Sequence, residues 1–371
     1  MKVLTVVGAR PQFIKAAAVS RELRKCHDEI LVHTGQHYDA DMSDVFFQEL
    51  GIPDADFNLQ VGSGAHGAQT GAMLAALEPV VVQERPDWVL IYGDTNSTLA
   101  GALVATKLHI PVAHVEAGVR SFDWRMPEEV NRFLSDMAAD LLLAPTQTAL
   151  ANLARENVRG RVLWVGDVML DLLDGASPAL DKRLGIVEGI GLHPGDYYAA
   201  TVHRADTTDD PAKLEAVLSA MAALDKPVVW PMHPRTRQRI ADFGLERYQS
   251  KFWLAPVGYF DMLALVRSSA AVLTDSGGLQ KEAAFLGVPC ITLRDTTEWV
   301  ELLEHGWSVL TGPDSASIQD AVRRLNSRNP GGQEALRQAF GGGRAAVRIV
   351  EALAMGPVGR ATAVTSGAVG S

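Results

Sequence analysis

The stretch VLTDSGGLQKEAAFLGVPCITLRDTTEW, residues 272–299, contains an apolar strand, a tight acidic glycine turn, a helix, a second strand and a polar loop. Strands and helices that alternate in this way are typical of a parallel sheet covered by helices on both faces. A helix that starts directly after such a turn presents free backbone N–H groups, and these groups favour an anion. The stretch therefore predicts an α/β fold and an anion site at the end of a strand.

The same alternation recurs along most of the chain. In the first half, apolar strands and the turns that follow them read VLTVVG (3–8), WVLIYGD (88–94), PVAHVEAG (111–118) and LLLAPT (141–146). After RVLWVGDVMLDLLDG (161–175) the pattern starts again with YYAATVH (197–203) and PVVWPMH (227–233). In doubly wound sheets, ligands bind outside the carboxyl ends of the strands. We therefore expect two doubly wound, Rossmann-like α/β domains that face each other across a cleft.

A length of 371 residues predicts two domains of ordinary size, and the chain divides into four predicted segments. Residues 1–170 form the first domain, which carries the acidic strand ends, and residues 171–342 form the second domain, which carries the glycine turn. Residues 343–355 form a terminal helix. Residues 356–371 are a tail of small residues, and their composition predicts disorder.

Composition and charge limit the kind of protein. With 47% hydrophobic and 21% charged residues, the sequence is typical of a globular protein with a large core. A formal net charge of −10 argues against a nucleic-acid partner, because phosphate backbones are bound through excess Lys and Arg. No apolar run reaches membrane-spanning length, and two cysteines do not suggest a disulfide framework. We therefore expect a cytoplasmic enzyme or binding protein without a membrane partner.

Three acids follow apolar strands or open a helix in the first half. Asp94 ends one strand, Glu116 ends the next, and Glu128 lies in MPEEVNR at a helix start. Asp94 could simply cap a helix, and Glu128 could simply favour the first helical turn. Glu116 lies between apolar neighbours, where a buried carboxylate is costly without a purpose. Acids that converge on one sheet edge could divide acid and base roles between them.

Basic residues also lie near strand ends. Arg10 and Lys15 in GARPQFIK could hold a phosphate or a sugar acid, or could simply be solvated. His203 and His233 each close a strand of the second half beside an arginine. The glycine and lysine motifs of dinucleotide folds and P-loops are absent, so NAD and ATP are poorly supported. The histidines of HTGQHYD lack an evident third ligand, which argues against a zinc site.

In the opening stretch, Ser276 and the N–H groups of Gly277 and Gly278 are positioned to point at a diphosphate. Glu282, one turn into the helix, could accept hydrogen bonds from a ribose. Arg294 and Glu298 lie on the loop after the neighbouring strand and could close over the same ligand. The alternative is a tight turn with an ordinary helix cap.

Seven motifs together resemble the non-hydrolysing UDP-N-acetylglucosamine 2-epimerase family. They are GARPQFIK, HTGQHYD, YGDTNSTLAG, HVEAGVRSF with MPEEVNR, HPRTR, TDSGGLQKEA and RDTTEWVE, in the family's order. The resemblance covers about residues 3–312. It implies a glycosyltransferase-B-like fold with the final helix crossing back onto the first domain. It also implies inversion at C2 of a UDP-2-acetamido sugar without a cofactor or a metal, and a homodimer.

The family mechanism implies roles for the matching residues. A carboxylate removes the C2 proton while UDP leaves C1, and a 2-acetamidoglycal forms before UDP returns. Asp94, Glu116 and Glu128 match the acid/base and stabilising positions, without a division of labour among them. His203 is placed with the catalytic set. The matching substrate-binding positions are Arg10, Lys15, Gln36, His37, Arg204, His233, Ser276, Gly277, Gly278, Glu282, Arg294 and Glu298.

The exact sugar stays open at this stage. HRADTTDD (203–210) has Asp206 and Thr207 where the family often has Glu and Asn, so that loop departs from the family pattern. Other motifs are closest to a branch that includes epimerases of UDP-2,3-diacetamido-2,3-dideoxyglucuronic acid. UDP-N-acetylglucosamine is our first choice of substrate, and the diacetamido uronic acid nucleotide is the alternative. A glycosyltransferase of the same fold, a hydrolysing epimerase and a UDP-sugar binding protein are rival interpretations.

Overall fold

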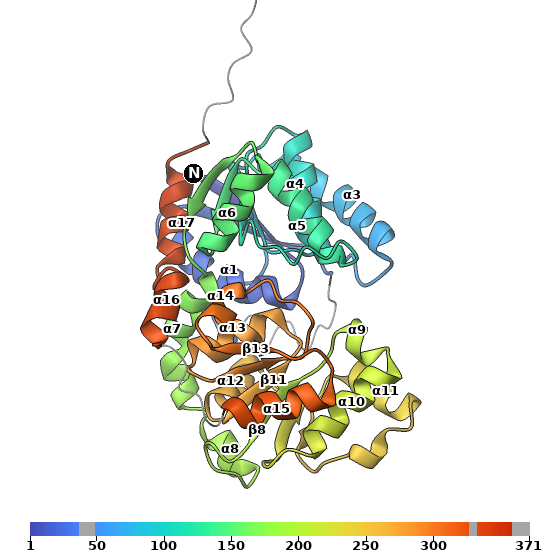
Figure 1. Cartoon of the computed structure of the whole chain (residues 1–371). Helices are drawn as coiled ribbons and strands as arrows, with labels where there is room; N and C mark the ends of the chain where they lie inside the picture. The colour runs from blue at the N-terminus through green and yellow to red at the C-terminus, as the bar shows by residue number, and fades with distance from the viewer. Residues whose placement is uncertain (37–48, 326–331, 358–371) are drawn as a thin grey trace, which may run out of the picture.

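The computed structural model describes residues 1–36, 49–325 and 332–357, and Figure 1 shows their arrangement. The strands within these ranges form two separate parallel sheets, with helices packed around each. This confirms the predicted fold of two Rossmann-like α/β domains. The predicted tail, except for Gly356 and Pro357, lies outside the described residues, and so does His37.

The first sheet has the strand order β3-β2-β1-β4-β5-β6-β7. Its strands are β1 (Lys2–Val7), β2 (Asp28–His33), β3 (Phe57–Asn58), β4 (Trp88–Tyr92), β5 (Val112–Val115), β6 (Leu141–Ala144) and β7 (Arg161–Trp164). The helices around it are α1 (Arg10–Leu23), α3 (His66–Glu84), α4 (Asn96–Lys107), α5 (Pro127–Ala138) and α6 (Gln147–Glu156). Because β1 pairs with both β2 and β4, the strand order reverses between β1 and β4.

The second sheet has the order β10-β9-β8-β11-β12-β13, and its order reverses between β8 and β11. Its strands are β8 (Tyr198–Thr201), β9 (Val228–Pro231), β10 (Trp253–Leu254), β11 (Ala271–Thr274), β12 (Cys290–Thr292) and β13 (Ser308–Leu310). The helices from here to the chain end are α7 (Val168–Asp181), α8 (Gly185–Gly189), α9 (Ala205–Thr208), α10 (Pro211–Ala222), α11 (Pro234–Asp242), α12 (Tyr259–Arg267), α13 (Gly277–Phe285), α14 (Val300–Glu304), α15 (Ser315–Leu325), α16 (Gln333–Ala339) and α17 (Ala345–Ala354), with a 3₁₀ helix at Glu246–Tyr248. In the described ranges, no helix combines the length and apolarity that crossing a membrane requires.

The turn after β1 shows how the sequence fixes the strand ends of the first sheet. Helix α1 starts at Arg10 with Pro11 in its first turn, where a missing N–H group costs no helical hydrogen bond. The Gln12 side chain accepts hydrogen bonds from the N–H groups of Gly8 (2.9 Å) and Ala9 (3.1 Å). Its amide group donates to the Tyr92 carbonyl (3.0 Å) at the end of β4. One side chain therefore joins the two strand ends where the sheet order reverses.

The chain passes between the two domains twice, and the two crossings touch. The Asp167 N–H donates to the Phe340 carbonyl (2.9 Å). Both Gly166 (φ +95°) and Gly341 (φ +87°) have left-handed backbones, and a Cβ on Gly341 would lie 2.5 Å from the Gly166 Cα. Arg348 donates through Nη1 to the carbonyls of both Val165 and Gly341, at 2.9 Å each. The two crossings are thus fastened together.

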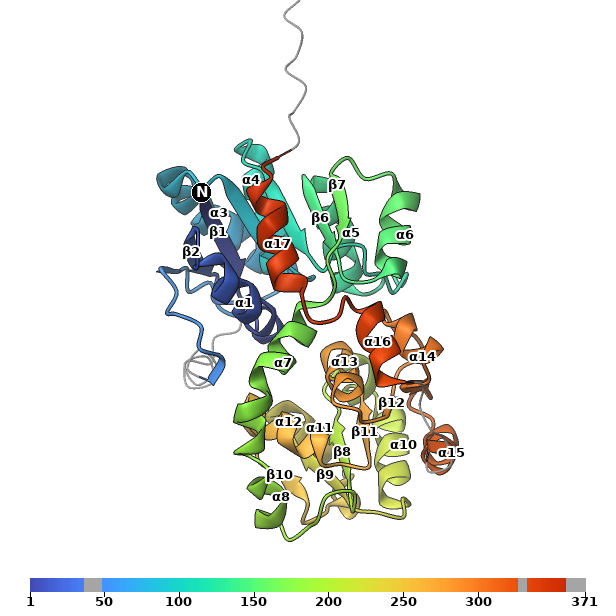
Figure 2. The same cartoon turned by 90° about the vertical axis from the view of Figure 1, so that its left-hand side faces the viewer.

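The last helix, α17, packs against α1 of the first domain and against α7, as Figure 2 shows. Its first N–H groups, from Ala345 and Ala346, donate to the Asp171 carboxylate of α7 at 3.0 and 2.7 Å. Helix α7 itself runs through residue 170 without a break. The division of the chain at that residue therefore stays a prediction.

Phe340, fully buried beside the crossings, makes edge-on contact with Phe285 (ring centroids 5.0 Å apart) and tilted contact with Trp299 (6.1 Å). Phe340→Ala should lower the free energy of unfolding by about 3–5 kcal/mol, because the lost ring leaves a cavity. Phe122→Ala removes the same ring from a position that is 66% exposed, and should have little effect. Urea unfolding of both variants measures the difference, and equal effects would contradict this assignment of Phe340 to the core.

Candidate active site

Most of the predicted site residues lie at the carboxyl ends of the central strands of the two sheets. In the first domain, Arg10 follows β1, Asp94 follows β4 and Glu116 follows β5. In the second domain, His203 follows β8 and Ser276 follows β11. Strands β1, β4, β8 and β11 flank the points where each sheet order reverses, and β5 is the neighbour of β4. Doubly wound folds bind ligands at these points.

Glu116 is buried and has an unusual backbone, with φ +71°. For a residue other than glycine this left-handed conformation costs about 1–3 kcal/mol, and it often marks a functional position. Its Oε1 accepts from Lys15 Nζ (2.5 Å), and its Oε2 accepts from Lys281 Nζ (3.1 Å). Gly93 lies beside this pair, and a Cβ there would sit 2.9 Å from Lys15 Nζ.

The two lysines control the charge of Glu116. Burial alone would raise the pKa of its carboxyl group, but the positive charges of Lys15 and Lys281 outweigh burial and lower the pKa from 4.5 to about 2. Glu116 is therefore ionised at neutral pH. Because the folded-state pKa is depressed, the stability that this group contributes is present above pH 4.5 and is lost as the pH falls towards 2.

Lys281 is a site residue that the sequence analysis did not identify. Its side chain is 1% exposed, and besides Glu116 it donates to the Asp167 carboxylate (2.5 Å). Its ammonium group also lies 3.7 Å from the centre of the Trp299 ring, a cation–π contact. Burial would lower the pKa of Lys281, and the charges of Asp167 and Glu116 raise it above its ordinary value. Lys281 therefore stays charged.

A second buried cluster surrounds Arg132 of α5, which the sequence analysis also did not identify. Arg132 donates to Asp94 Oδ2 from Nη2 (2.6 Å) and Nε (3.0 Å), and to Glu129 Oε2 from Nη1 (3.0 Å). It also donates to Glu298 Oε1 of the second domain (3.2 Å). One guanidinium group thus connects Asp94 to the loop that carries Glu298.

Glu128 and Glu129 have different environments, although they are adjacent. Glu129 is 1% exposed, and its carboxylate accepts from the N–H groups of Ser121 (2.9 Å) and Phe122 (3.0 Å) as well as from Arg132. Glu129 therefore holds the loop that leads into α5. Glu128 is half-buried, and its side chain makes no ion pair or hydrogen bond with the described part of the chain. Its carboxylate is not committed to a structural contact there.

Arg294 and Glu298 form a two-pronged ion pair, as their spacing in RDTTEW allows. The Arg294 Nη1 and Nη2 atoms lie 2.8 and 3.1 Å from the two Glu298 oxygens. Burial would raise the pKa of Glu298, but Arg132 and Arg294 outweigh burial and depress it strongly. A Cβ on Gly277 would be 3.8 Å from Glu298 Oε2 and 4.0 Å from Arg294 Nη1, so this pair lies next to the glycine turn.

The glycine turn is the N-terminus of α13. The Ser276 Oγ accepts from the Leu279 N–H (3.4 Å), and the Ser276 N–H donates to Thr274 Oγ1 (3.0 Å). Gly277 and Gly278 are the first helical residues and are half-buried. The predicted helix cap is therefore present, and the turn retains the free N–H geometry that favours an anion.

The loop after β8 is held beside this turn by a buried acid. The Asp275 carboxylate accepts from the backbone N–H groups of His203 (2.9 Å) and Arg204 (2.8 Å), and the His203 ring lies 3.5 Å away. The His203 side chain is 46% exposed, so it remains accessible. His233 is exposed at the start of α11, where its Nδ1 accepts from the Arg235 N–H (3.2 Å).

Glu282 is buried in α13 and faces the first domain. It accepts from the Tyr259 hydroxyl group (2.7 Å). Burial raises the pKa of Glu282, while Tyr259 and Arg10 act in the opposite direction. Burial lowers the pKa of the Arg10 guanidinium group, while the charges of Glu282 and Glu49 act in the opposite direction. Arg10 and Glu282 thus lie close enough to influence each other electrostatically across the domain junction.

Gln36 lies elsewhere in the first domain, beside the start of α4. Its Oε1 accepts from the N–H group (3.1 Å) and the hydroxyl group (2.7 Å) of Ser97. These contacts place Gln36 beside the first turn of α4, where Ser97 lies three residues after Asp94 in the sequence.

A histidine that the sequence analysis passed over supports the same strand ends. His114 is fully buried two residues before Glu116. Its Nδ1 lies 2.7 Å from Asp136 Oδ1, and its Nε2 lies 2.7 Å from the Gly93 carbonyl. The ring thus ties the end of β5 to the end of β4, and so fixes Glu116 relative to the turn before Asp94.

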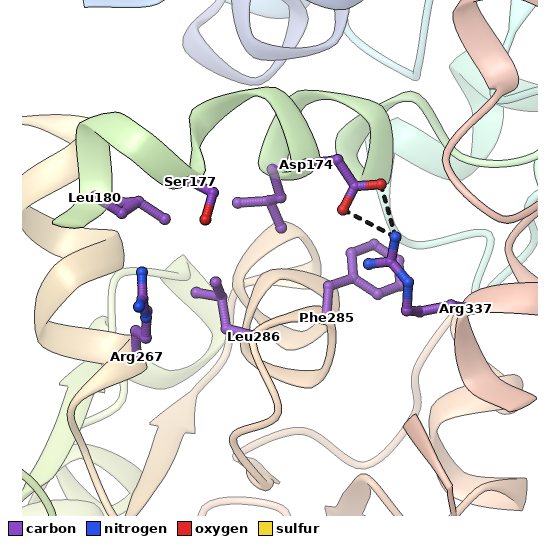
Figure 3. A pocket seen from close by; sticks show the side chains of 8 residues that line it. Asp174, Ser177, Leu180, Arg267, Phe285, Leu286 and Arg337 are labelled. Carbon is purple, nitrogen blue, oxygen red and sulfur yellow. Dashed lines mark hydrogen bonds and ion pairs between the residues drawn. The ribbon is translucent and has the colours of Figure 1, made fainter. Parts of the chain in front are cut away.

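A cavity of about 320 Å³ lies away from these clusters, between α7 and the helices of the second domain (Figure 3). It is lined by Leu173, Asp174, Ser177, Leu180, Arg267, Phe285, Leu286 and Arg337. Arg337 donates to both oxygens of Asp174, at 2.9 and 2.7 Å. None of its lining residues belongs to the predicted site.

The chain belongs to the UDP-N-acetylglucosamine 2-epimerase family, whose sequence model matches residues 21–354. It is 46% identical over 358 residues to a UDP-N-acetylglucosamine 2-epimerase homolog of Methanococcus maripaludis, covering 95% of this chain and 99% of that protein. It is 47% identical over 363 residues to the UDP-2,3-diacetamido-2,3-dideoxy-D-glucuronate 2-epimerase of Pseudomonas aeruginosa, with the same coverage.

Solved structures agree with this assignment. The fold matches the UDP-GlcNAc 2-epimerase of Methanocaldococcus jannaschii, crystallised in complex with UDP-GlcNAc and UDP, with a TM-score of 0.88 and 40% identity. The match covers 96% of this chain and 100% of that chain. The predicted family is confirmed, and the chain is an isomerase-type enzyme.

Arg132→Met should lower the free energy of unfolding by about 3–5 kcal/mol, because it leaves the Asp94 and Glu129 carboxylates without their buried counter-charge, while Glu298 keeps Arg294. Arg125→Met is the control. That guanidinium group also pairs with an acid, Asp123, but its side chain is 90% exposed, and its loss should not change stability measurably. Urea unfolding at neutral pH compares the two variants. A wild-type midpoint for Arg132→Met would show that the cluster is not a structural connection.

Proposed function

We propose that the chain is a non-hydrolysing 2-epimerase that interconverts UDP-N-acetylglucosamine and UDP-N-acetylmannosamine. The observation that carries the proposal is the ionised, conformationally strained Glu116 at the end of β5, across the domain junction from the glycine turn of α13. A base for a sugar proton and a site for a diphosphate then lie on opposite sides of one junction. The likeness to a structure crystallised with UDP-GlcNAc supports the same substrate.

In this proposal the first domain handles the proton. One carboxylate removes the C2 proton, the electron pair forms the C1–C2 double bond, and the C1–O bond breaks with UDP as the leaving group. The resulting 2-acetamidoglycal then takes a proton on the opposite face of C2 as UDP adds back to C1. Two faces require more than one acid/base group. Glu116, Asp94 and Glu128 are the candidates, and Glu128 has the least committed carboxylate among them.

The second domain would hold the leaving group. The N–H groups of Gly277 and Gly278 and the Ser276 side chain lie at the start of α13, where negative charge is stabilised. His203 and Arg204 are held beside this turn by Asp275, and Arg10 approaches from the first domain. Glu282 would accept hydrogen bonds from the ribose hydroxyl groups, as a buried acceptor already bonded to Tyr259.

The remaining predicted residues would surround the sugar and the nucleotide. Lys15 would lie at the sugar, since it already holds the Glu116 carboxylate. Arg294 and Glu298 would close over the sugar from the second domain. Gln36 and His233 would contribute binding contacts from the rim of the site, where each already holds a loop or a helix start.

A second substrate has a specific observation in its favour. The similarity to the P. aeruginosa epimerase of UDP-2,3-diacetamido-2,3-dideoxy-D-glucuronate reaches 47% identity over nearly the whole chain. That sugar has the same C2 acetamido group and the same UDP leaving group, so the same residues would serve both reactions. The two substrates differ at C3 and C6, and a direct comparison is required to choose between them.

The test is proton NMR of UDP-N-acetylglucosamine with the purified protein in D₂O. Removal and return of the C2 proton should place deuterium at C2 while UDP-N-acetylmannosamine signals grow. Retention of the C2 proton would reject this substrate, and the same experiment with the diacetamido uronic acid nucleotide would then test the second. Continuous accumulation of free UDP would show a hydrolysing enzyme. Transfer to an added acceptor would show a glycosyltransferase.

Glu116→Gln is the control variant for that experiment. The amide keeps the size of the side chain but cannot take the proton. Turnover should therefore fall by about 100-fold or more, while the affinity for UDP, measured by calorimetry, should stay close to that of the wild type. Equal losses of turnover and UDP affinity would show that Glu116 has a structural role instead.

We also propose that the enzyme acts as a cytoplasmic homodimer. Family resemblance supports the dimer, and the free cysteines Cys26 and Cys290 fit a reducing compartment. Analytical ultracentrifugation should give about twice the chain mass of 39.9 kDa, and a single species at the chain mass would contradict the dimer. Cell fractionation tests the location.

A further inference from the structure

Four buried charges form a line through the junction between the domains. Lys15 of α1 contacts Glu116 (2.5 Å), Glu116 contacts Lys281 of α13 (3.1 Å), and Lys281 contacts Asp167 at the start of α7 (2.5 Å). The side chains are between 1% and 9% exposed. Two positive and two negative charges alternate, so the line is neutral as a whole.

Stability alone does not explain why four charged side chains are buried next to one another. Removing an ammonium group from water costs several kcal/mol, and an apolar side chain of similar volume usually packs as well or better. Lys281 is nevertheless placed where three groups hold it at once: Asp167, Glu116 and the face of Trp299. Lys15, by contrast, has Glu116 as its single ion-pair partner in the described part of the chain. Lys281 is therefore the fixed cation of the two.

The position of Lys281 in the sequence connects it to the nucleotide side of the site. It lies on α13, whose first turn is formed by Gly277 and Gly278, and directly precedes Glu282. Lys281 thus reaches out of the second domain to a carboxylate of the first. The Glu116 carboxylate has one cation from each domain, and each of its oxygens is occupied by one of them.

We propose that Lys281 is a positioning residue for the reaction, which fixes the Glu116 carboxylate from the second domain, while Asp167 and Trp299 hold Lys281 in place. This deepens the proposed epimerase function and rests on it. When Glu116 takes a proton, Lys15 is the cation that moves away from the carboxyl group, since it has no second ion-pair partner among the described residues to hold it. The ionised state of Glu116 then depends on the two domains being together.

Among the residues that the structure describes, few charged groups lie around Glu116, and they can be changed separately. Lys15 faces it from α1 and Lys281 from α13, and Asp167 of α7 lies behind Lys281. Glu282 lies on the same helix as Lys281, and the positive charge of Lys281 acts to lower the pKa of Glu282. Lys281→Met removes the cation and keeps an unbranched side chain against Trp299. Adding Asp167→Asn removes the acid that would otherwise be left unpaired and buried.

The first measurement needs no substrate. Carbon-13 NMR of protein labelled at the glutamate side-chain carboxyl carbon follows the Glu116 signal, which is assigned as the one missing from Glu116→Gln. In the wild type, Glu116 should stay ionised down to pH 4. In Lys281→Met with Asp167→Asn, its midpoint should move up by about one pH unit or more, a tenfold change in proton affinity per unit. A wild-type Glu116 that titrates near 4.5 would overturn the proposal even if the variants do not fold.

The second measurement is the pH profile of kcat, with whichever UDP-sugar the wild type epimerises. The double variant should lose about tenfold or more in kcat, its acidic limb should move to higher pH, and KM should change little. Asp167→Asn alone is the matched control. Lys281 keeps its charge and its contacts with Glu116 and the Trp299 ring, so the acidic limb should not move up. A wild-type profile for the folded double variant would reduce Lys281 to a structural role. No turnover by the wild type would instead reject the epimerase, and would leave the NMR result to judge Lys281 separately.

Discussion

The arrangement of the site depends on one constraint, which is that parallel strands in a sheet end at the same edge. In each domain the strand order reverses beside the central strand, at β1 and β4 in the first and at β8 and β11 in the second. The turns at these points are the places where a polar side chain can leave an apolar strand and still lie beside others of its kind. Asp94 and Glu116 therefore come together without being neighbours in the sequence, and Ser276 meets the loop of His203 in the same way.

The charged residues at the junction show how a protein can keep carboxylates ionised inside a low-polarity environment. Glu116 and Glu298 would both be neutralised by burial alone, and in each case two cations reverse that tendency. Glu116 of the first domain is paired with Lys281 of the second, and Glu298 of the second domain is paired with Arg132 of the first. Ion pairs of this kind contribute little net stability compared with apolar packing. Their effect here is that the charge and the position of each carboxylate depend on contact between the two domains.

Much of this could be predicted from the sequence. The apolar strands, the glycine turn of TDSGG and the position of Asp94 and Glu116 at strand ends all follow from local patterns. The ion pair between Arg294 and Glu298 was not predicted, because both residues were expected to close over the ligand. Lys281 and Arg132 were not predicted, because the partners that connect them to the other domain lie 165 and 166 residues away, at Glu116 and Glu298. In the sequence each is an ordinary cation on a helix. The left-handed backbone of Glu116 could not be predicted from the local sequence either, since glycine is the residue that usually indicates that conformation.

The two chain crossings between the domains have a mechanical consequence. They run side by side, joined by the Asp167–Phe340 hydrogen bond and by Arg348, which grips both backbones. Two connections at separate places would resist rotation of one domain against the other. Because the two connections are fastened at one place, any rotation of one domain against the other would be centred there. Asp167 lies at that place, so Lys281 would keep its anchor while Glu116 moved with the first domain.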